Sequence, residues 1–188
     1  MPDLRGHGES EGHYIGMVWH DRLDMLRWID EIVRDDPEAE ILLFGISMGG
    51  ATVMMTSGEA LPPNVKVIVE DCGYTSVWDE FSVQLKEQFG LPSFPIMQAA
   101  SVMTKLRAGF WLAEADAVKQ VAKSTTPMLF IHGEDDTFVP FWMLDVLFEA
   151  AGCEKEKFIV SGARHGMASS VDPDGYWAAV EVFVEKYI

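Results

Sequence analysis

The chain has 188 residues, of which 48% are hydrophobic, so one domain over residues 1–188 can bury a substantial core. Its formal charge of −16, from 14 basic and 30 acidic side chains, argues against nucleic acid and anionic lipid as partners. No stretch approaches the roughly 20 apolar residues of a membrane span, so we expect a cytoplasmic protein, with a membrane anchor upstream of Met1 left open.

The two cysteines give no sign of metal or redox chemistry. Cys72 and Cys153 have neither C-x-x-C spacing nor nearby paired histidines. Both are expected to be small buried hydrophobes in a reducing compartment. The sequence therefore predicts neither a metal nor a cofactor.

The first part of the chain predicts a loop followed by a helix. Residues 3–12 are rich in glycine and charge, which is typical of a loop, although no strand precedes them. Apolar residues at helical spacing then predict a helix from about Gly16 to Arg34, and the sequence D-D-P at residues 35–37 ends it.

The next stretch carries the candidate nucleophile. Residues 41–44 are four consecutive apolar residues closed by a glycine, which predicts a strand buried on both faces. Residues 45–49 then fit the G-x-S-x-G nucleophile elbow, a tight strand-to-helix turn that would hold Ser47 clear of the sheet. The N–H of Met48, at the start of the following helix, would point where an oxyanion forms. Taken alone, the motif also fits an ordinary loop.

A second strand and a helical insertion follow. Residues 65–69 are rich in β-branched side chains and predict a strand parallel to the first. Residues from about 72 to 125 carry helical patterns broken by glycine and proline and are rich in aromatics and methionine. They are interpreted equally well as a lid over a site and as a helical layer packed on the sheet. As a lid, they would line an apolar acyl pocket with Trp78, Phe81 and Phe94.

The last third of the chain predicts two more strands, each followed by a polar loop and a helix. The strands are expected at residues 128–132 and 157–160, and the loops at 133–140 and 161–166. A helix over about 141–151 lies between them, and a last helix begins at the capping pair Asp172 and Pro173.

Three loops at the carboxyl ends of predicted strands carry a complete set of catalytic groups. In open α/β sheets such loops meet at one edge, which would bring together Ser47, one of the pair Asp135 and Asp136, and His165. The order serine, aspartate, histidine is that of the α/β-hydrolase triad. Chemistry alone does not choose between the two aspartates, and His132 is expected to be structural.

Four motifs in order resemble the α/β-hydrolase superfamily, and within it bacterial esterase-like or serine-aminopeptidase-like hydrolases. They are D-L-R-G-H-G-E-S at 3–10, G-I-S-M-G-G at 45–50, I-H-G-E-D-D-T-F-V-P at 131–140 and A-R-H-G at 163–166. The resemblance implies a parallel sheet flanked by helices with a helical lid at about 72–125. It also implies that the triad acid is Asp136, the fifth position of the family's H-G-x-x-D pattern.

The resemblance also implies that the N-terminal part of the sheet lies outside this chain. The family's D-x-R-G-x-G-x-S loop follows the fourth strand of its sheet, and upstream of that strand lie three more strands and the loop that supplies the second oxyanion donor. The chain is therefore expected to be the C-terminal portion of a hydrolase, with the strand at 41–44 exposed at the sheet edge. A homo-oligomer formed through this edge is one expected way of covering it.

The function expected from these features is that of a serine hydrolase. Ser47, His165 and Asp136 would cleave small to medium acyl esters through an acyl-enzyme intermediate, without a cofactor. The alternatives are a peptidase or amidase with the same triad, and a non-catalytic remnant that serves as a binding or assembly module.

Overall fold

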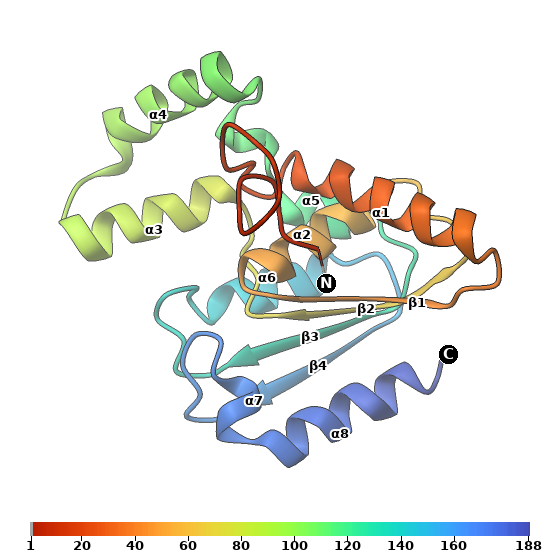
Figure 1. The fold of residues 1–188 in the computed structure, drawn as a ribbon. Helices are drawn as coiled ribbons and strands as arrows, with labels where there is room; N and C mark the ends of the chain where they lie inside the picture. The colour runs from red at the N-terminus through yellow and green to blue at the C-terminus, as the bar shows by residue number, and fades with distance from the viewer. Residues whose placement is uncertain (1) are drawn as a thin grey trace.

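The computed structural model, which describes residues 2–188, contains one sheet of four parallel strands (Figure 1). The strands lie side by side in chain order: β1 (Ile41–Ile46), β2 (Val65–Asp71), β3 (Met128–Gly133) and β4 (Lys155–Val160). All four predicted strands are confirmed, and their parallel pairing places all four carboxyl ends at the same edge of the sheet.

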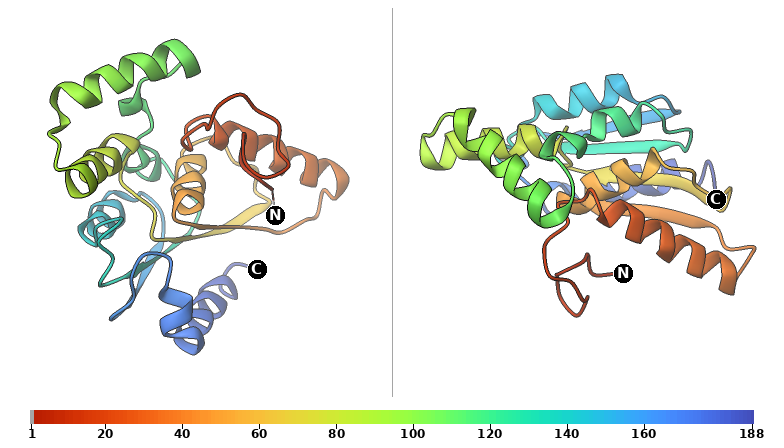
Figure 2. Two further views of the ribbon diagram at one scale, coloured as in Figure 1. Left: turned by 60° about the vertical axis from the view of Figure 1, so that its left-hand side comes forward. Right: turned by 90° about the horizontal axis from the view of Figure 1, so that it is seen from above.

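Helices cover both faces of the sheet, so the fold has three layers (Figures 1 and 2). One face is covered by α1 (Asp21–Asp35), α2 (Met48–Ser57), α5 (Ala117–Val121) and α6 (Trp142–Ala150). The short α7 (Ala168–Val171) and α8 (Pro173–Val184) cover the other face. This arrangement confirms the predicted α/β class.

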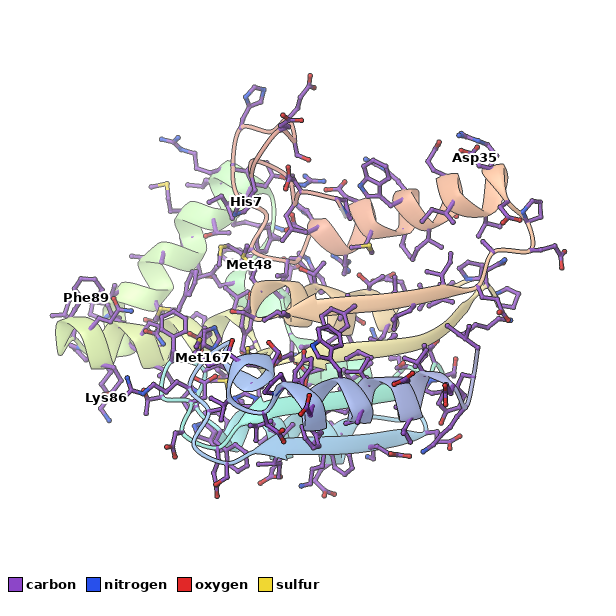
Figure 3. All side chains as sticks on the ribbon, turned by 60° about the horizontal axis from the view of Figure 1, so that its bottom comes forward. His7, Asp35, Met48, Lys86, Phe89 and Met167 are labelled. Atoms are coloured by element: carbon purple, nitrogen blue, oxygen red, sulfur yellow. The ribbon has the colours of Figure 1, made fainter. Side chains whose placement is uncertain are left out.

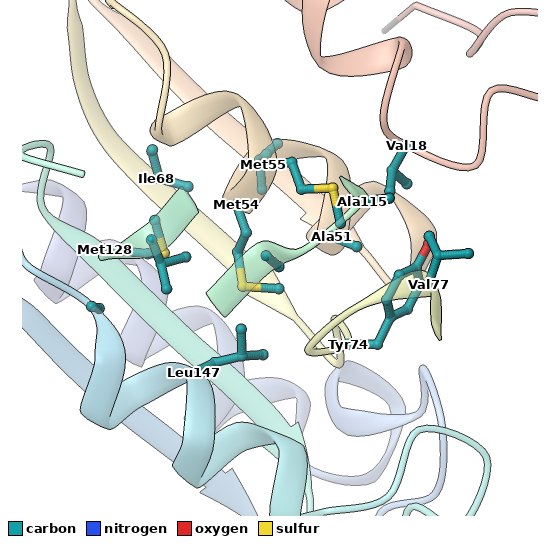
Figure 4. Packing of buried hydrophobic residues seen from close by; sticks show 14 of the residues in the cluster. Val18, Ala51, Met54, Met55, Ile68, Tyr74, Val77, Ala115, Met128 and Leu147 are labelled. Atoms are coloured by element: carbon teal, nitrogen blue, oxygen red, sulfur yellow. The ribbon is translucent and has the colours of Figure 1, made fainter. Parts of the chain in front are cut away.

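Each face has its own core because successive strand residues point to opposite sides. On the α2 side, Met54, Met128 and Leu147 are fully buried between helices and sheet (Figure 4). On the α8 side, Val69, Ile131 and Phe183 belong to a second buried cluster. The central strand β3 contributes to both cores, and all six of its residues are buried.

Local sequence signals set the ends of several helices. The Ser76 side chain caps α3 (Val77–Phe89) by accepting a hydrogen bond from the N–H of Asp79. The Asp172 side chain caps α8 in the same way, and Pro173 occupies its first turn, as predicted. The predicted helix at 16–34 begins only at Asp21, because residues 17–20 form turns in which Met17 and Val18 have positive φ.

The helices α3 and α4 (Ser93–Ala108), hereafter the arm, project from the carboxyl edge of the sheet (Figures 1 and 2). Lys86 and Phe89 lie at the outer end of α3 (Figure 3). The remainder of the segment at 72–125 belongs to the body, since α5 packs against α2 and α6. The arm and the connection between its two helices expose seven large apolar side chains: Phe89, Leu91, Phe94, Ile96, Val102, Met103 and Leu106.

Strand β1 lies at the edge of the sheet. Within residues 2–188 it pairs with β2 alone, which leaves its outer backbone groups unpaired by any other strand. A largely apolar groove runs between this strand and α1, lined by Pro2, Met25, Trp28, Ile29, Ile32, Ile41 and Leu43. In the same part of the chain, no helix combines the length and apolar character needed to cross a bilayer.

Candidate active site

Ser47 occupies a strained turn between β1 and α2. Its backbone angles are φ 55° and ψ −116°, and its N–H donates a hydrogen bond of 2.7 Å to the carbonyl of Asp71. A positive φ is uncommon for a residue with a side chain and is often found at functional sites. The turn holds the hydroxyl at the carboxyl end of β1, where the G-x-S-x-G pattern predicted it.

Glycine is required by space at two of the three positions around this turn. A Cβ atom at Gly45 would overlap the carbonyl group of Gly49, and one at Gly50 would lie 2.9 Å from the carbonyl oxygen of Asp71. At Gly49 itself, no atom outside its own helix backbone lies within 4 Å of the Cβ position. Close approach of backbone to backbone therefore explains why Gly45 and Gly50 are glycines, but it does not explain Gly49.

Two hydrogen bonds join Ser47, His165 and Asp136. The distance between Ser47 Oγ and His165 Nε2 is 2.7 Å, and that between His165 Nδ1 and Asp136 Oδ2 is also 2.7 Å. An ionised carboxylate can only accept hydrogen bonds, so Nδ1 carries the imidazole proton and Nε2 is free to accept from the serine hydroxyl. The structure thus brings together three residues that lie up to 118 positions apart in the sequence.

The protein holds Asp136 ionised in a buried position. Its Oδ1 accepts hydrogen bonds from the backbone N–H groups of Phe138 and Val139, at 2.9 and 3.0 Å. Burial alone would raise the pKa of Asp136, but hydrogen bonds and charge interactions with His132 and His165 lower it to about 2. The neighbouring Asp135 is exposed, and its backbone N–H bonds to the carbonyl of Ala163.

His132, which was expected to be structural, contacts Asp136 of this site. It is fully buried, and its Nε2 lies 3.0 Å from the carbonyl oxygen of Val139 and 3.4 Å from Asp136 Oδ2. Burial lowers the pKa of His132, but the contacts with Asp136, Val139 and Glu70 outweigh it and raise the pKa overall. The carboxylate of Asp136 therefore lies between two imidazoles. The four-residue spacing from His132 to Asp136 is the one sequence signal of this contact.

The other predicted site residues differ in burial and in their place in the fold. Met48 opens α2, so its N–H belongs to the first helical turn, which has no acceptor within the helix. Trp78 and Phe81 are partly buried and pack against the main core. Phe94 is 72% exposed at the start of α4, so its side chain is turned largely to solvent.

Phe138 is a neighbour of His165 that the sequence did not indicate. Its ring centroid lies 4.9 Å from that of the imidazole, at a tilt of 40°. Its carbonyl oxygen accepts a hydrogen bond of 2.5 Å from the side chain of Gln84 on α3, which connects this loop to the arm. The x-x position before V-P in the motif carries no fixed residue type, so no pattern pointed to Phe138.

A buried carboxylate, Glu70, lies behind the elbow at the end of β2. Its Oε2 accepts a hydrogen bond of 2.9 Å from the N–H of Gly73, whereas its Oε1 has no hydrogen-bond partner among residues 2–188. Burial raises the pKa of Glu70 to about 8. An unfolded chain releases this proton near the ordinary value of 4.5, so Glu70 makes the fold less stable as pH rises from about 4.5 to 8.

We therefore expect Glu70→Gln to stabilise the protein increasingly as pH rises. Since a difference of one pKa unit corresponds to about 1.4 kcal/mol, the gain in unfolding free energy should grow by about 2–4 kcal/mol between pH 5 and pH 8. Urea unfolding at both pH values measures it. Glu87→Gln, at an exposed position, serves as the control. An equal effect of Glu70→Gln on the unfolding free energy at the two pH values would contradict the raised pKa of Glu70.

The three-layer fold, the serine elbow and the linked aspartate and histidine define the class of α/β-hydrolase folds. The family model described as "Serine aminopeptidase, S33" matches residues 1–70. The match covers 70 of the 188 residues and, taken with the fold, makes the chain similar to members of the α/β-hydrolase superfamily.

Similar proteins include esterases and peptidases. The uncharacterized protein YqkD of Bacillus subtilis is 24% identical over 98% of this chain, which spans only 61% of that relative's length. The esterase Pf2001 of Pyrococcus furiosus has a TM-score of 0.76 and 19% identity, covering 98% of this chain and 69% of its own. The acylaminoacyl peptidase of Pyrococcus horikoshii has a TM-score of 0.65 and 17% identity, covering 88% of this chain and 27% of its own.

Proposed function

We propose that this chain carries the catalytic residues of a serine hydrolase that cleaves small to medium acyl esters. The observation that carries the proposal is the continuous chain of two 2.7 Å hydrogen bonds from Ser47 through His165 to Asp136. The resemblance to the Pyrococcus furiosus esterase in fold supports the same class of reaction.

In this proposal, His165 removes the proton from Ser47 as the hydroxyl oxygen attacks the acyl carbon. Asp136 fixes the tautomer that leaves Nε2 open and stabilises the imidazolium that forms. The N–H of Met48 donates to the oxyanion, and His165 then returns the proton to the leaving alcohol. Water, activated by His165 in turn, hydrolyses the acyl-enzyme on Ser47 and restores the free serine.

A fluorophosphonate probe tests the nucleophile directly, because it forms a stable bond only with an activated serine. We expect one label per chain, lost in Ser47→Ala and kept in Ser161→Ala, in which an exposed serine directly after β4 is replaced. Absence of labelling in the unmodified protein would favour the non-catalytic binding module instead.

A peptidase or amidase with the same residues is the second candidate function. The family model for serine aminopeptidases and the likeness to an acylaminoacyl peptidase favour it. Turnover of p-nitrophenyl esters of increasing acyl length, measured beside aminoacyl anilides, separates the two. Faster turnover of the anilides at equal probe labelling would replace the esterase proposal with the peptidase.

The arm is proposed to act as a lid and to shape the acyl pocket. Trp78 and Phe81 are the proposed lining residues on α3, while the side chain of Phe94 is turned largely to solvent. Alanine at Trp78 should therefore shift the preferred acyl length more than alanine at Phe94. The same panel of esters measures both variants, and an unchanged profile in Trp78→Ala would argue against a pocket at α3.

A further inference from the structure

Cys72 brings a sulfur atom to the same centre. This residue directly follows β2, while Asp136 and His165 follow the neighbouring strands β3 and β4. One potential metal-binding atom from each of the three residues lies within 4.8 Å of the other two. Cys72 is 1% exposed, and its backbone N–H donates a hydrogen bond of 2.9 Å to the carbonyl of Ile131, so the strand ends fix its position.

We propose that Cys72, Asp136 and His165 form an inhibitory site for a thiophilic divalent cation such as Zn²⁺. Sulfur, imidazole nitrogen and carboxylate oxygen are the three protein donors that zinc prefers. With bond lengths of about 2.0–2.3 Å, a tetrahedral ion places its donors roughly 3.3–3.7 Å apart. The three donors therefore need to move by no more than about 1–1.5 Å, and water or the Ser47 hydroxyl can supply a fourth ligand.

Binding of the cation is incompatible with the hydrogen bonds of the free site. The ion replaces the thiol proton, which passes to solvent, and takes the lone pair of one imidazole nitrogen. Coordination through Nδ1 requires the proton on Nδ1 to move to Nε2 and breaks the hydrogen bond to Asp136, whereas coordination through Nε2 uses the lone pair already present and breaks the hydrogen bond to Ser47. In either case one of the two 2.7 Å hydrogen bonds is lost. The inhibition, unlike the binding, rests on the proposed hydrolase function.

The surroundings of the Cys72 thiol argue against its acting as a second nucleophile. Burial, together with the nearby Asp71 and Glu70, raises the pKa of Cys72 far above its usual range. The free thiol therefore keeps its proton and is a poor nucleophile at neutral pH. The side chain of His165 is 23% exposed, whereas that of Asp136 is fully buried, so an ion would reach the site past the imidazole.

The binding step is tested with Cd²⁺, whose thiolate bond gives an ultraviolet charge-transfer band. We expect the band to appear on titration of the unmodified protein and of Cys153→Ala, in which the other free cysteine is replaced. It should be absent in Cys72→Ala and in Cys72→Ser, whose side chain keeps the size of the original. A band that survives in both Cys72 variants, or no band in the unmodified protein, would overturn the site.

The inhibition step is tested by ester turnover with added Zn²⁺. The zinc concentration for half inhibition, measured against each variant's own metal-free rate, should rise about 10-fold or more in Cys72→Ala and stay unchanged in Cys153→Ala. Mg²⁺ should have no effect, because it does not favour sulfur ligands. Equal sensitivity of the two variants would refute inhibition through Cys72. A cadmium band without any ester turnover would count against the hydrolase proposal and leave the metal site standing.

Discussion

Asp136→Asn is expected to lower kcat for ester hydrolysis by about 10⁴-fold while changing KM little. An asparagine in this place can offer its NH₂ group to His165 Nδ1, which then becomes the acceptor. The imidazole proton moves to Nε2, and that nitrogen can no longer accept a proton from Ser47. The loss therefore comes from the wrong tautomer in a site of nearly unchanged shape.

Asp135→Asn is the matched control for this experiment. It makes the same chemical change one residue away, on a side chain that is exposed. We expect turnover to stay within about three-fold of the unmodified protein, because a surface substitution of this kind changes free energies by only about 0.5 kcal/mol. Steady-state kinetics on one p-nitrophenyl ester measures both variants. An equal loss of turnover in the two variants, or a larger loss in Asp135→Asn, would show that Asp136 is not the acid of the triad.

Gly45→Ala is expected to destabilise the fold by about 3–5 kcal/mol. The added methyl group would overlap the carbonyl carbon and oxygen of Gly49, which are backbone atoms at the start of α2. Relief of this overlap requires the strand and the helix to move apart at the elbow. The variant should therefore lose both urea resistance and reaction with the fluorophosphonate probe.

The control for this change is Gly49→Ala in the same turn. Its methyl group would meet no atom outside the helix backbone within 4 Å, and alanine favours a helix over glycine by about 1 kcal/mol. We expect the midpoint of urea unfolding to stay level or to rise. A fall in Gly49→Ala as large as that in Gly45→Ala would show that the elbow does not depend on the backbone contact described above.

The sequence predicted most elements because local patterns and burial agree in them. The strands 41–46, 65–71 and 128–133 are apolar runs between helical patterns, and each contributes buried side chains to the core. The candidate serine, aspartate and histidine were predicted because each follows a strand, and parallel strands bring such loops to one edge. The short α7 at 168–171 was missed, since four residues carry no periodicity.

Contacts that depend on tertiary packing were not predictable in this way. Cys72 was expected to be an inert buried hydrophobe, and its burial is confirmed, but its approach to Asp136 and His165 depends on how three strands are aligned. Cys153 is only partly buried, contrary to expectation, because it lies in the connection from α6 to β4. The raised pKa of Glu70 likewise follows from burial, which a single residue type cannot indicate.

The order of the strands has a consequence for the loop that carries His165. Adjacent strands are about 4.8 Å apart, so β4 and β1 are separated by three spacings, or roughly 14 Å. Residues 161–164 must lead the imidazole back over two strands before it can meet the serine. Each residue supplies at most about 3.3–3.6 Å of reach, so the length of this loop, and not only the presence of the serine, aspartate and histidine, decides whether the ring can meet the serine.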